Sequence, residues 1–215
     1  QAQILGHFEH LHIGQLSCTI FADSRTLVTS GTDCVVSIWT YNSTAKSVDL
    51  QPAGSLFGHR NPVNVLAVSR SFSALLSAST DGQIMLWDLN QHTFVRELPA
   101  SGPVDVSDAR KLTKRPCSFR QRLTSAQCAR INDVTGEIMV CRGNRISIYT
   151  LNGALLLEQD VCESIDDRVM SCVFYEGVDN EWQERELIFT GHRKGVVNVR
   201  CPDFFLKTVL SLPSG

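Results

Sequence analysis

The amino-acid sequence predicts an all-β fold built from a repeated unit of four short antiparallel strands. Its apolar residues recur with a period close to two, as in residues 34–39 (CVVSIW), 64–68 (NVLAV) and 145–149 (RISIY). These runs are short, rich in β-branched residues and bounded by Gly, Asp, Asn or Ser, which is typical of strands joined by tight turns. No stretch has the period of about 3.6 residues that marks a convincing amphipathic helix.

An internal repeat supports this prediction. In each copy an apolar strand runs into a polar turn, and the next strand ends in a large side chain. The strand-and-turn segments are residues 27–33, 75–81, 138–143 and 188–194, and the strands after them are residues 34–39, 82–87, 144–149 and 195–200. The turn positions 33, 81, 143 and 194 are 48, 62 and 51 residues apart. Outer strands follow at 93–98 and 154–158, and four-stranded units at this spacing indicate the blades of a β-propeller.

One of these units resembles a WD repeat. Gly58 and His59 precede it, residues 77–82 (SASTDG) form its turn, and Trp87 and Asp88 close it. In that family four side chains stabilise the blade by mutual hydrogen bonds: a His before the first strand, a Ser or Thr, a turn Asp and a Trp. We call this set the tetrad. The resemblance places it here at the residues His59, Ser77, Asp81 and Trp87.

The other blades match the tetrad less well. The first offers Thr29, Asp33 and Trp39, with a histidine from the segment 7–12. In the third and fourth blades Gly143 and Lys194 stand where the Asp belongs. The Trp position holds Tyr149 in the third blade and Arg200 in the fourth. We therefore expect packing, rather than a polar network, to hold these two blades.

A closer resemblance lies in the second half of the chain. Residues 130–138 (RINDVTGEI), 149–153 (YTLNG), 180–182 (NEW) and 188–197 (IFTGHRKGVV) resemble the terminal propeller of BEACH-domain proteins, the beige, neurobeachin and Alfy-like group. The resemblance implies a large cytoplasmic scaffold that works in vesicle trafficking, lysosomal or autophagic membrane processes. It also implies peripheral association with endomembranes through the full-length protein.

The chain is expected to be a partial propeller over residues 1–215. The expected blades cover roughly residues 14–57, 58–100, 123–162 and 167–212, with an insertion at 101–122. Propellers of the resembled family usually have seven blades, and an arc of four leaves two sheet edges open. We therefore expect a seven-blade ring whose other blades lie upstream of Gln1 or in disordered stretches.

Composition excludes several other classes. The net charge of −2 gives no general attraction to nucleic acid or acidic membranes. The eight cysteines form no C-x-x-C pair and no zinc-finger spacing, so we expect free thiols in apolar strands. We expect no metal and no cofactor. No apolar run approaches the roughly 18 residues of a membrane span.

Candidate residues for partner binding lie on expected loops, where propellers use aromatic and arginine side chains as anchors. They are Trp182, Arg60, Arg142, Arg145, Arg193 and Lys194. Trp182 stands among polar neighbours, so packing under its own loop is the alternative.

The insertion carries basic residues that are candidates for phosphate contact. They are Arg110, Lys111, Lys114, Arg115 and Arg120, with Arg122 just beyond. A solvated loop is the simpler interpretation, because loop length affects stability only weakly. Segment 110–122 also supports an alternative hypothesis, a nucleic-acid-associated WD-repeat adaptor, although the aromatic side chains expected for base stacking are nearly absent.

Two further clusters suggest chemistry but are better explained as structure. His10 and His12 share a face if their segment is extended, with Glu9 beside them, which would suit a metal; a tetrad histidine among loop residues is the simpler explanation. His192 lacks a G-x-S-x-G serine and an orienting acid, so we expect a turn residue. The sequence therefore predicts a non-catalytic protein-interaction scaffold that binds other proteins and has no small-molecule substrate.

Overall fold

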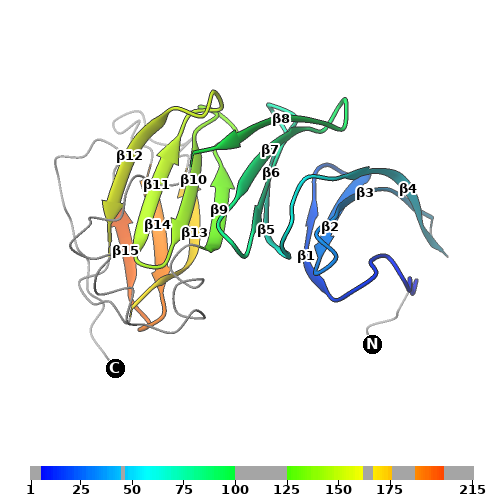
Figure 1. Cartoon of the computed structure of the whole chain (residues 1–215), viewed down its shortest axis with the longest axis horizontal. Helices are drawn as coiled ribbons and strands as arrows, with labels where there is room; N and C mark the ends of the chain where they lie inside the picture. Colours follow the sequence, from blue (N-terminus) through cyan, green and yellow to red (C-terminus); the bar gives the residue numbers. More distant parts are fainter. Residues whose placement is uncertain (1–5, 45–46, 100–124, 162–166, 176–186, 201–215) are drawn as a thin grey trace.

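The structure, a computed structural model, describes residues 6–44, 47–99, 125–161, 167–175 and 187–200. In these residues the regular elements are all strands, arranged in four antiparallel sheets in which neighbours in sequence are neighbours in the sheet. The all-β, blade-like architecture predicted from the repeat is confirmed. Figure 1 shows the sheets following one another in chain order, with the first, in blue, at one end.

Each sheet forms one blade. The strands of blade 1 are β1 (Leu16–Phe21), β2 (Thr26–Gly31), β3 (Val36–Ser43) and β4 (Val48–Leu56). Those of blade 2 are β5 (Val63–Ser69), β6 (Ala74–Ser79), β7 (Ile84–Asp88) and β8 (Thr93–Leu98). Those of blade 3 are β9 (Ala126–Ile131), β10 (Ile138–Arg142), β11 (Arg145–Tyr149) and β12 (Leu155–Asp160). Blade 4 contains β13 (Val169–Tyr175), β14 (Leu187–His192) and β15 (Val197–Arg200). The expected outer strand of blade 4, within 201–212, lies outside the described residues.

The first strands of the four sheets pack against one another in order. β1 contacts β5, β5 contacts β9 and β9 contacts β13. Because the remaining strands of each sheet run outward from this row, the sheets fan around a shared edge, as propeller blades do. The limits of the four predicted blades and of the insertion extend into residues that the structure does not describe, so they stay predictions.

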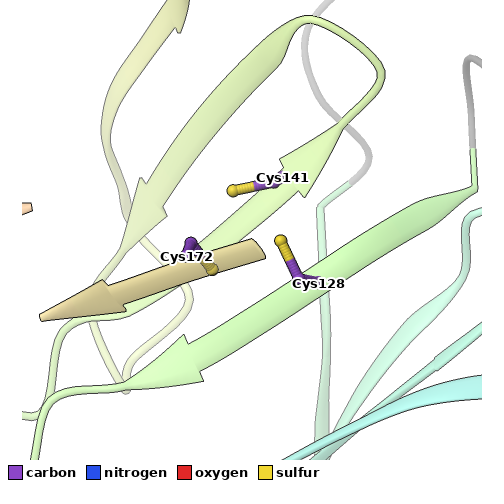
Figure 2. Close-up of side chains that lie close together, drawn as sticks. All are labelled: Cys128, Cys141 and Cys172. Carbon is purple, nitrogen blue, oxygen red and sulfur yellow. The ribbon is translucent and has the colours of Figure 1, made fainter. Parts of the chain in front are cut away.

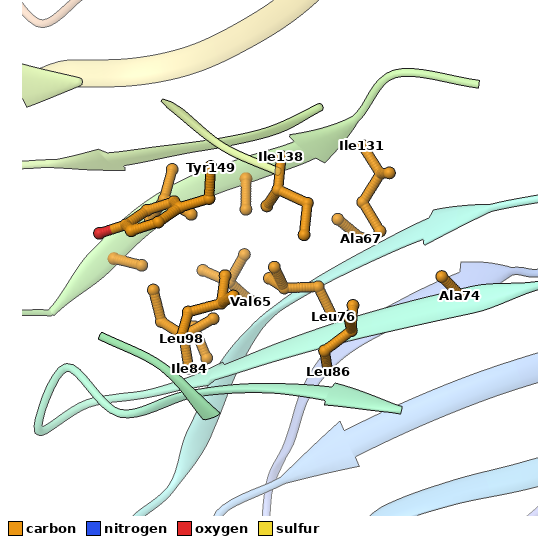
Figure 3. Packing of buried hydrophobic residues seen from close by; sticks show 14 residues of the cluster. Val65, Ala67, Ala74, Leu76, Ile84, Leu86, Leu98, Ile131, Ile138 and Tyr149 are labelled. Atoms are coloured by element: carbon orange, nitrogen blue, oxygen red, sulfur yellow. The ribbon is translucent and has the colours of Figure 1, made fainter. Parts of the chain in front are cut away.

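The core consists of apolar clusters between successive blades. One lies between blades 1 and 2, around Val28, Leu66 and Leu75. The second lies between blades 2 and 3 and includes Leu76 and Tyr149 (Figure 3). A third fills the space between blades 3 and 4. The second strands β6 and β10 are buried on both faces, whereas β1 is largely exposed on one face. Burial on both faces explains why the sequences of β6 and β10 are almost continuously apolar.

The turn between the second and third strands requires a left-handed backbone in every blade. Gly82, Gly143 and Gly195 have φ angles of 95°, 59° and 79°. Glycine adopts this region without steric conflict because it lacks a Cβ atom. In blade 1 the corresponding residue is Cys34, with a φ of 65°, so that turn is the most strained of the four.

Candidate interaction face

One end of the fan carries three of the sequence-predicted binding residues, Arg60, Arg193 and Lys194. Leu16 pairs with Gly31 and Val36 pairs with Leu56, so the loop before the first strand and the turn between the second and third strands lie together. We call this end the turn face. It comprises the loops 6–15, 32–35, 57–62, 80–83, 143–144 and 193–196.

The structure places the predicted partner-binding arginines in different environments. Arg60, Arg193 and Lys194 are exposed on the turn face. Arg145 is 31% exposed and pairs with Asp160, its Nε lying 2.8 Å from that carboxylate. Trp182 lies outside the described residues, as do all the predicted phosphate-binding residues of segment 110–122.

The prediction that Arg142 is an exposed anchor is wrong. This side chain is only 6% exposed, because it lies at the end of a second strand that is buried on both faces. Its Nη1 donates a hydrogen bond to the Tyr149 hydroxyl at 3.2 Å. Arg142 therefore belongs to the interior of blade 3.

Two apolar side chains on the turn face were missed by the sequence reasoning. Ile13 is 99% exposed and Phe57 is 72% exposed. Among the described residues they are the two most exposed large hydrophobic side chains, and Phe57 lies in the same loop as Arg60, a combination of aromatic and arginine side chains that is enriched in protein contacts. The available signal was their position, since each stands outside a strand and within two residues of a tetrad histidine.

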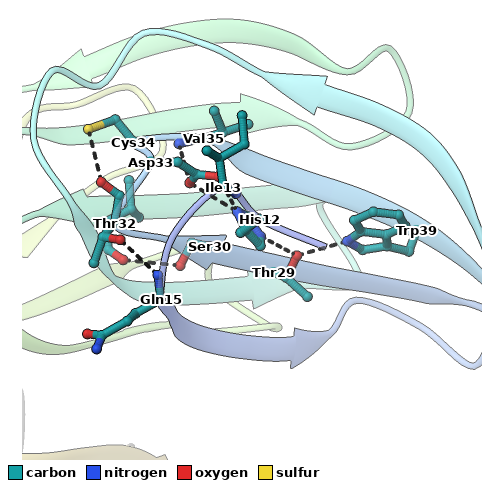
Figure 4. A network of polar contacts seen from close by, with 11 residues as sticks. His12, Ile13, Gln15, Thr29, Ser30, Thr32, Asp33, Cys34, Val35 and Trp39 are labelled. Carbon is teal, nitrogen blue, oxygen red and sulfur yellow. Dashed lines mark hydrogen bonds and ion pairs between the residues drawn. The ribbon is translucent and has the colours of Figure 1, made fainter. Parts of the chain in front are cut away.

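Blade 1 contains a complete tetrad, and the histidine that completes it is His12 (Figure 4). Trp39 Nε1 donates to Thr29 Oγ1 at 2.8 Å, and that hydroxyl lies 2.8 Å from His12 Nε2. His12 Nδ1 lies 2.9 Å from the Asp33 carboxylate. One arrangement satisfies all of these groups: the Thr29 hydroxyl donates to Nε2, while Nδ1–H donates to the carboxylate.

The charge of Asp33 is stabilised in this network. Burial alone would raise the pKa of its carboxyl, but hydrogen bonds from His12 and from the backbone N–H groups of Val35 and Ile13 outweigh it, so the pKa lies below its usual value. The order Asp33, His12, Thr29 is also that of a catalytic triad. The Thr29 hydroxyl, however, is 1% exposed and bonded to an indole N–H, so no substrate can reach it and the set serves the structure.

Blade 2 has the predicted residues but a different connection. Trp87 Nε1 donates to Ser77 Oγ at 2.8 Å, and Ser77 Oγ lies 2.7 Å from His59 Nε2. Asp81 instead accepts hydrogen bonds from Asn61 and Ser79. Burial lowers the pKa of His59 and outweighs the opposing effects of Gln83 and Asp81.

Blade 3 replaces the tetrad with apolar packing, as expected. Val140 stands at the hydroxyl position, and Tyr149 at the Trp position is fully buried. The Tyr149 hydroxyl also donates to the carbonyl of Pro99, the residue after β8, at 3.2 Å. The ring that closes blade 3 is thereby bonded to blade 2.

Blade 4 does not fit the expectation that packing alone holds it. Thr190 Oγ1 lies 3.0 Å from His192 Nε2, and His192 Nδ1 lies 3.5 Å from Asp167. Arg200, at the Trp position, donates to Thr190 Oγ1 and to the carbonyl of Val161. The histidine comes from the second strand itself, and the acid comes from the loop before the first strand. The sequence pattern did not reveal this network because the usual tetrad has its histidine before the first strand and its acid in the turn.

The N-terminal histidines take separate roles. His12 is committed to the tetrad, and its side chain is 2% exposed. His7 Nε2 and His10 Nε2 lie 3.2 Å and 3.9 Å from the exposed Glu9 carboxylate, apart from the buried His12. The three imidazoles therefore do not converge, which favours the interpretation of one structural histidine among loop residues.

Three cysteines that are distant in sequence meet between blades 3 and 4 (Figure 2). Cys128 comes from β9, Cys141 from β10 and Cys172 from β13, and their Sγ atoms all lie within 4.8 Å of one another. Hydrogen bonds from the other two thiols lower the pKa of Cys128, and the pKa values of Cys141 and Cys172 are raised. Spacing rules could not reveal the cluster because its members belong to three strands in two sheets.

Comparison with known proteins agrees with this geometry. Residues 50–88 match the family described as "WD domain, G-beta repeat". The fold, the repeat and the tetrads thus define a WD-repeat β-propeller.

Individual relatives show to which group of WD-repeat proteins the chain belongs. The chain is 30% identical over 215 residues, 99% of its length, to the human WD repeat- and FYVE domain-containing protein 4. It is 29% identical over 204 residues, 93% of its length, to BEACH domain-containing protein A2 of Arabidopsis thaliana, and 28% identical over 144 residues, 65% of its length, to the human lysosomal-trafficking regulator. The chain is a WD-repeat segment of the BEACH-domain group.

This segment is a small part of those proteins. It spans 6%, 5% and 3% of the length of the three relatives. In the described residues no helix has the length and apolar character needed to cross a membrane.

Proposed function

We propose that this segment is a non-catalytic protein-interaction scaffold that binds its partner on the turn face. The observation that carries the proposal is the contrast between its two groups of side chains. The hydroxyl and imidazole groups that resemble catalytic sets are buried in the tetrads. The exposed groups on the same end include the apolar side chains of Ile13 and Phe57 and the cationic side chains of Arg60, Arg193 and Lys194.

The anchors have the chemistry of a protein contact. Phe57 and Arg60 lie three residues apart in one loop, and both are exposed. Ile13, Arg193 and Lys194 extend the surface over the loops of blades 1 and 4. Aromatic and arginine side chains contribute most to binding when a partner covers them, because they bury large areas and desolvate directional donors.

The cellular setting comes from the relatives. One of them is named a lysosomal-trafficking regulator. We extend that role to this chain: a cytoplasmic protein that acts in vesicle trafficking, lysosomal or autophagic membrane processes, held at endomembranes by its partners or by other parts of the full-length protein.

The test compares the two ends of the fan. Phe57→Ser with Arg60→Glu alters the turn face, and Val134→Ser with Arg25→Glu likewise replaces one exposed apolar side chain and one exposed arginine at the opposite end. Each form of the whole chain is purified from cells with its bound proteins, which are then quantified by mass spectrometry. We expect the turn-face variant to lose a defined set of endomembrane proteins and the opposite-end variant to keep it.

Equal recovery of partners by both variants contradicts the proposal. The nucleic-acid adaptor has its own signature, because phosphate contacts release counterions and weaken steeply as salt rises. Protein partners should remain bound between low and high salt and after nuclease treatment. Recovery that depends on nucleic acid would replace the proposed function with the adaptor.

A further inference from the structure

The three cysteines between blades 3 and 4 occupy a place that recurs elsewhere in the molecule. Thr29, Ser77, Val140 and Thr190 mark the same position on the four second strands. Opposite them, the first strands carry Thr19, Leu66, Ala129 and Cys172. The register therefore allows the junctions between blades to be compared position by position.

The register places three equivalent positions at each junction: two in one blade and one in the next. Between blades 1 and 2 they are Cys18, Ser30 and Leu66; between blades 2 and 3 they are Val65, Ala78 and Ala129; between blades 3 and 4 they are Cys128, Cys141 and Cys172. The first two sets pack the junction with at most one cysteine. Packing at this place therefore does not require sulfur, and the accumulation of three thiols needs another reason.

From this juxtaposition we propose that Cys128, Cys141 and Cys172 form a binding site for a thiophilic d10 metal ion, Zn²⁺ or Cu⁺, between blades 3 and 4. Thiolate is the ligand that both ions prefer, and three thiolates suit either trigonal Cu⁺ or tetrahedral Zn²⁺ with one further ligand. The site lies within the cluster that packs the two blades together.

The distances fit a metal after a small contraction. A Zn–S bond of about 2.3 Å places tetrahedral sulfur ligands roughly 3.8 Å apart. The three Sγ atoms lie within 4.8 Å of one another without any ion, so the side chains need to move by about 1 Å or less. Strands β9, β10 and β13 hold them in place on rigid sheets, which favours defined geometry.

Burial and charge are also suitable. Cys141 is fully buried and Cys172 is 5% exposed, while Cys128 is only partly buried. A fourth ligand for tetrahedral Zn²⁺ would have to come from water, whereas trigonal Cu⁺ needs none. Three thiolates with Zn²⁺ carry one net negative charge, and the guanidinium of Arg130 acts on Cys128 from the same strand, which offsets that charge.

The chain supplies its own control. In the triple variant Cys128→Val, Cys141→Ala and Cys172→Ala, the junction takes the side chains found between blades 2 and 3, so the fold should be kept. Cys18→Ser changes the matching cysteine of the first junction and leaves the site intact. Both variants are compared with the unaltered chain after reduction and removal of metal, with circular dichroism as a check on folding.

Titration with Zn²⁺, with Co²⁺ as a spectroscopic substitute and with Cu⁺ against a chelator then distinguishes the ions. We expect the unaltered chain and Cys18→Ser to bind one ion with thiolate-to-metal absorption and a raised melting temperature. Loss of the three thiols should weaken binding by more than about 100-fold, since loss of outer-shell partners alone weakens it by about 10- to 100-fold. Cys128→Val alone should have a similar effect.

Three results would overturn the proposal. One is the absence of stoichiometric binding of either ion to the reduced chain. Another is equal binding by the unaltered chain and the triple variant, which would assign the metal to other thiols. The third is a stable disulfide within the cluster that persists in place of metal binding, which would assign the thiols to redox chemistry instead.

Discussion

Blades 1 and 2 differ from blades 3 and 4 in how the residue at the Trp position is held. In blades 1 and 2 the indole N–H of Trp39 or Trp87 donates to a hydroxyl on the same sheet. In blades 3 and 4, Tyr149 and Arg200 also reach the carbonyl of the residue that follows the previous blade's outer strand. The same place in the fold is thus stabilised within one blade in the first half and across two blades in the second.

The difference shows that the backbone position matters more than the particular side chains. A large group at this place must cover the sheet and find a partner for its polar end, because an unpaired buried donor is unfavourable. Tryptophan, tyrosine and arginine all satisfy both conditions, each with a different partner. Departure from the usual tetrad therefore does not by itself mean a weaker blade.

The largest expected effect tests the packing in blade 3. Tyr149→Ala removes a fully buried ring from the cluster between blades 2 and 3 and should lower the free energy of unfolding by about 3–5 kcal/mol. Tyr149→Phe keeps the ring and should lower it by about 1 kcal/mol through the lost hydroxyl. Guanidinium denaturation measures both. A loss in Tyr149→Phe as large as in Tyr149→Ala would mean that the inter-blade hydrogen bond, rather than packing, holds blade 3.

A reciprocal exchange tests whether the hydrogen-bonded hydroxyl of blade 1 and the apolar side chain at the same position of blade 3 can replace each other. Thr29→Val leaves Trp39 and His12 without their shared hydroxyl in blade 1, and Val140→Thr places a hydroxyl within an apolar cluster in blade 3. Each should lower the free energy of unfolding by about 1–3 kcal/mol, because each leaves a buried polar group unpaired. Urea denaturation of the two variants is the measurement. A stabilising Val140→Thr would show that blade 3 accepts the tetrad and would remove the distinction.

The smallest effect concerns pH. Burial holds the pKa of His59 below its ordinary value of 6.5, so the unfolded chain binds a proton more readily than the folded chain. Stability from this group is present above about pH 6.5 and is lost as the pH falls through that value. In His59→Gln the loss of stability between pH 7 and pH 5 should be smaller, with a remainder from His192, whose pKa burial also lowers. An unchanged slope in denaturation at the two pH values would count against this role.

The sequence predicted the sheets well because strand periodicity and turn residues are local signals. The residues His59, Ser77 and Trp87 were identified from the same pattern, and the structure brings them together. The partner of Asp81 was not predictable, since Asn61 competes for the carboxylate only once the loop before β5 has folded over the turn.

The errors arise where distance in space and distance in sequence diverge. Arg142 was predicted to lie in a loop because it stands beside a turn. It is instead the last residue of β10, which is buried on both faces, and its side chain lies in the interior. The Thr190–His192 network uses an acid from the loop before its blade. The three-cysteine cluster combines strands of two blades, so only the register between sheets makes it visible.

The hydrogen bonds of Tyr149 and Arg200 have a consequence for how such blades can be rearranged. A blade whose tryptophan donates to a hydroxyl of its own sheet keeps that hydrogen bond independently of the blade before it, although its apolar face still packs on the neighbouring blade. A blade that uses a carbonyl of its predecessor depends on how that neighbour is placed, because the tyrosine hydroxyl or the guanidinium reaches its acceptor only if the backbone after the preceding outer strand lies at the same distance. These two contacts therefore constrain the spacing between blades 2 and 3 and between blades 3 and 4.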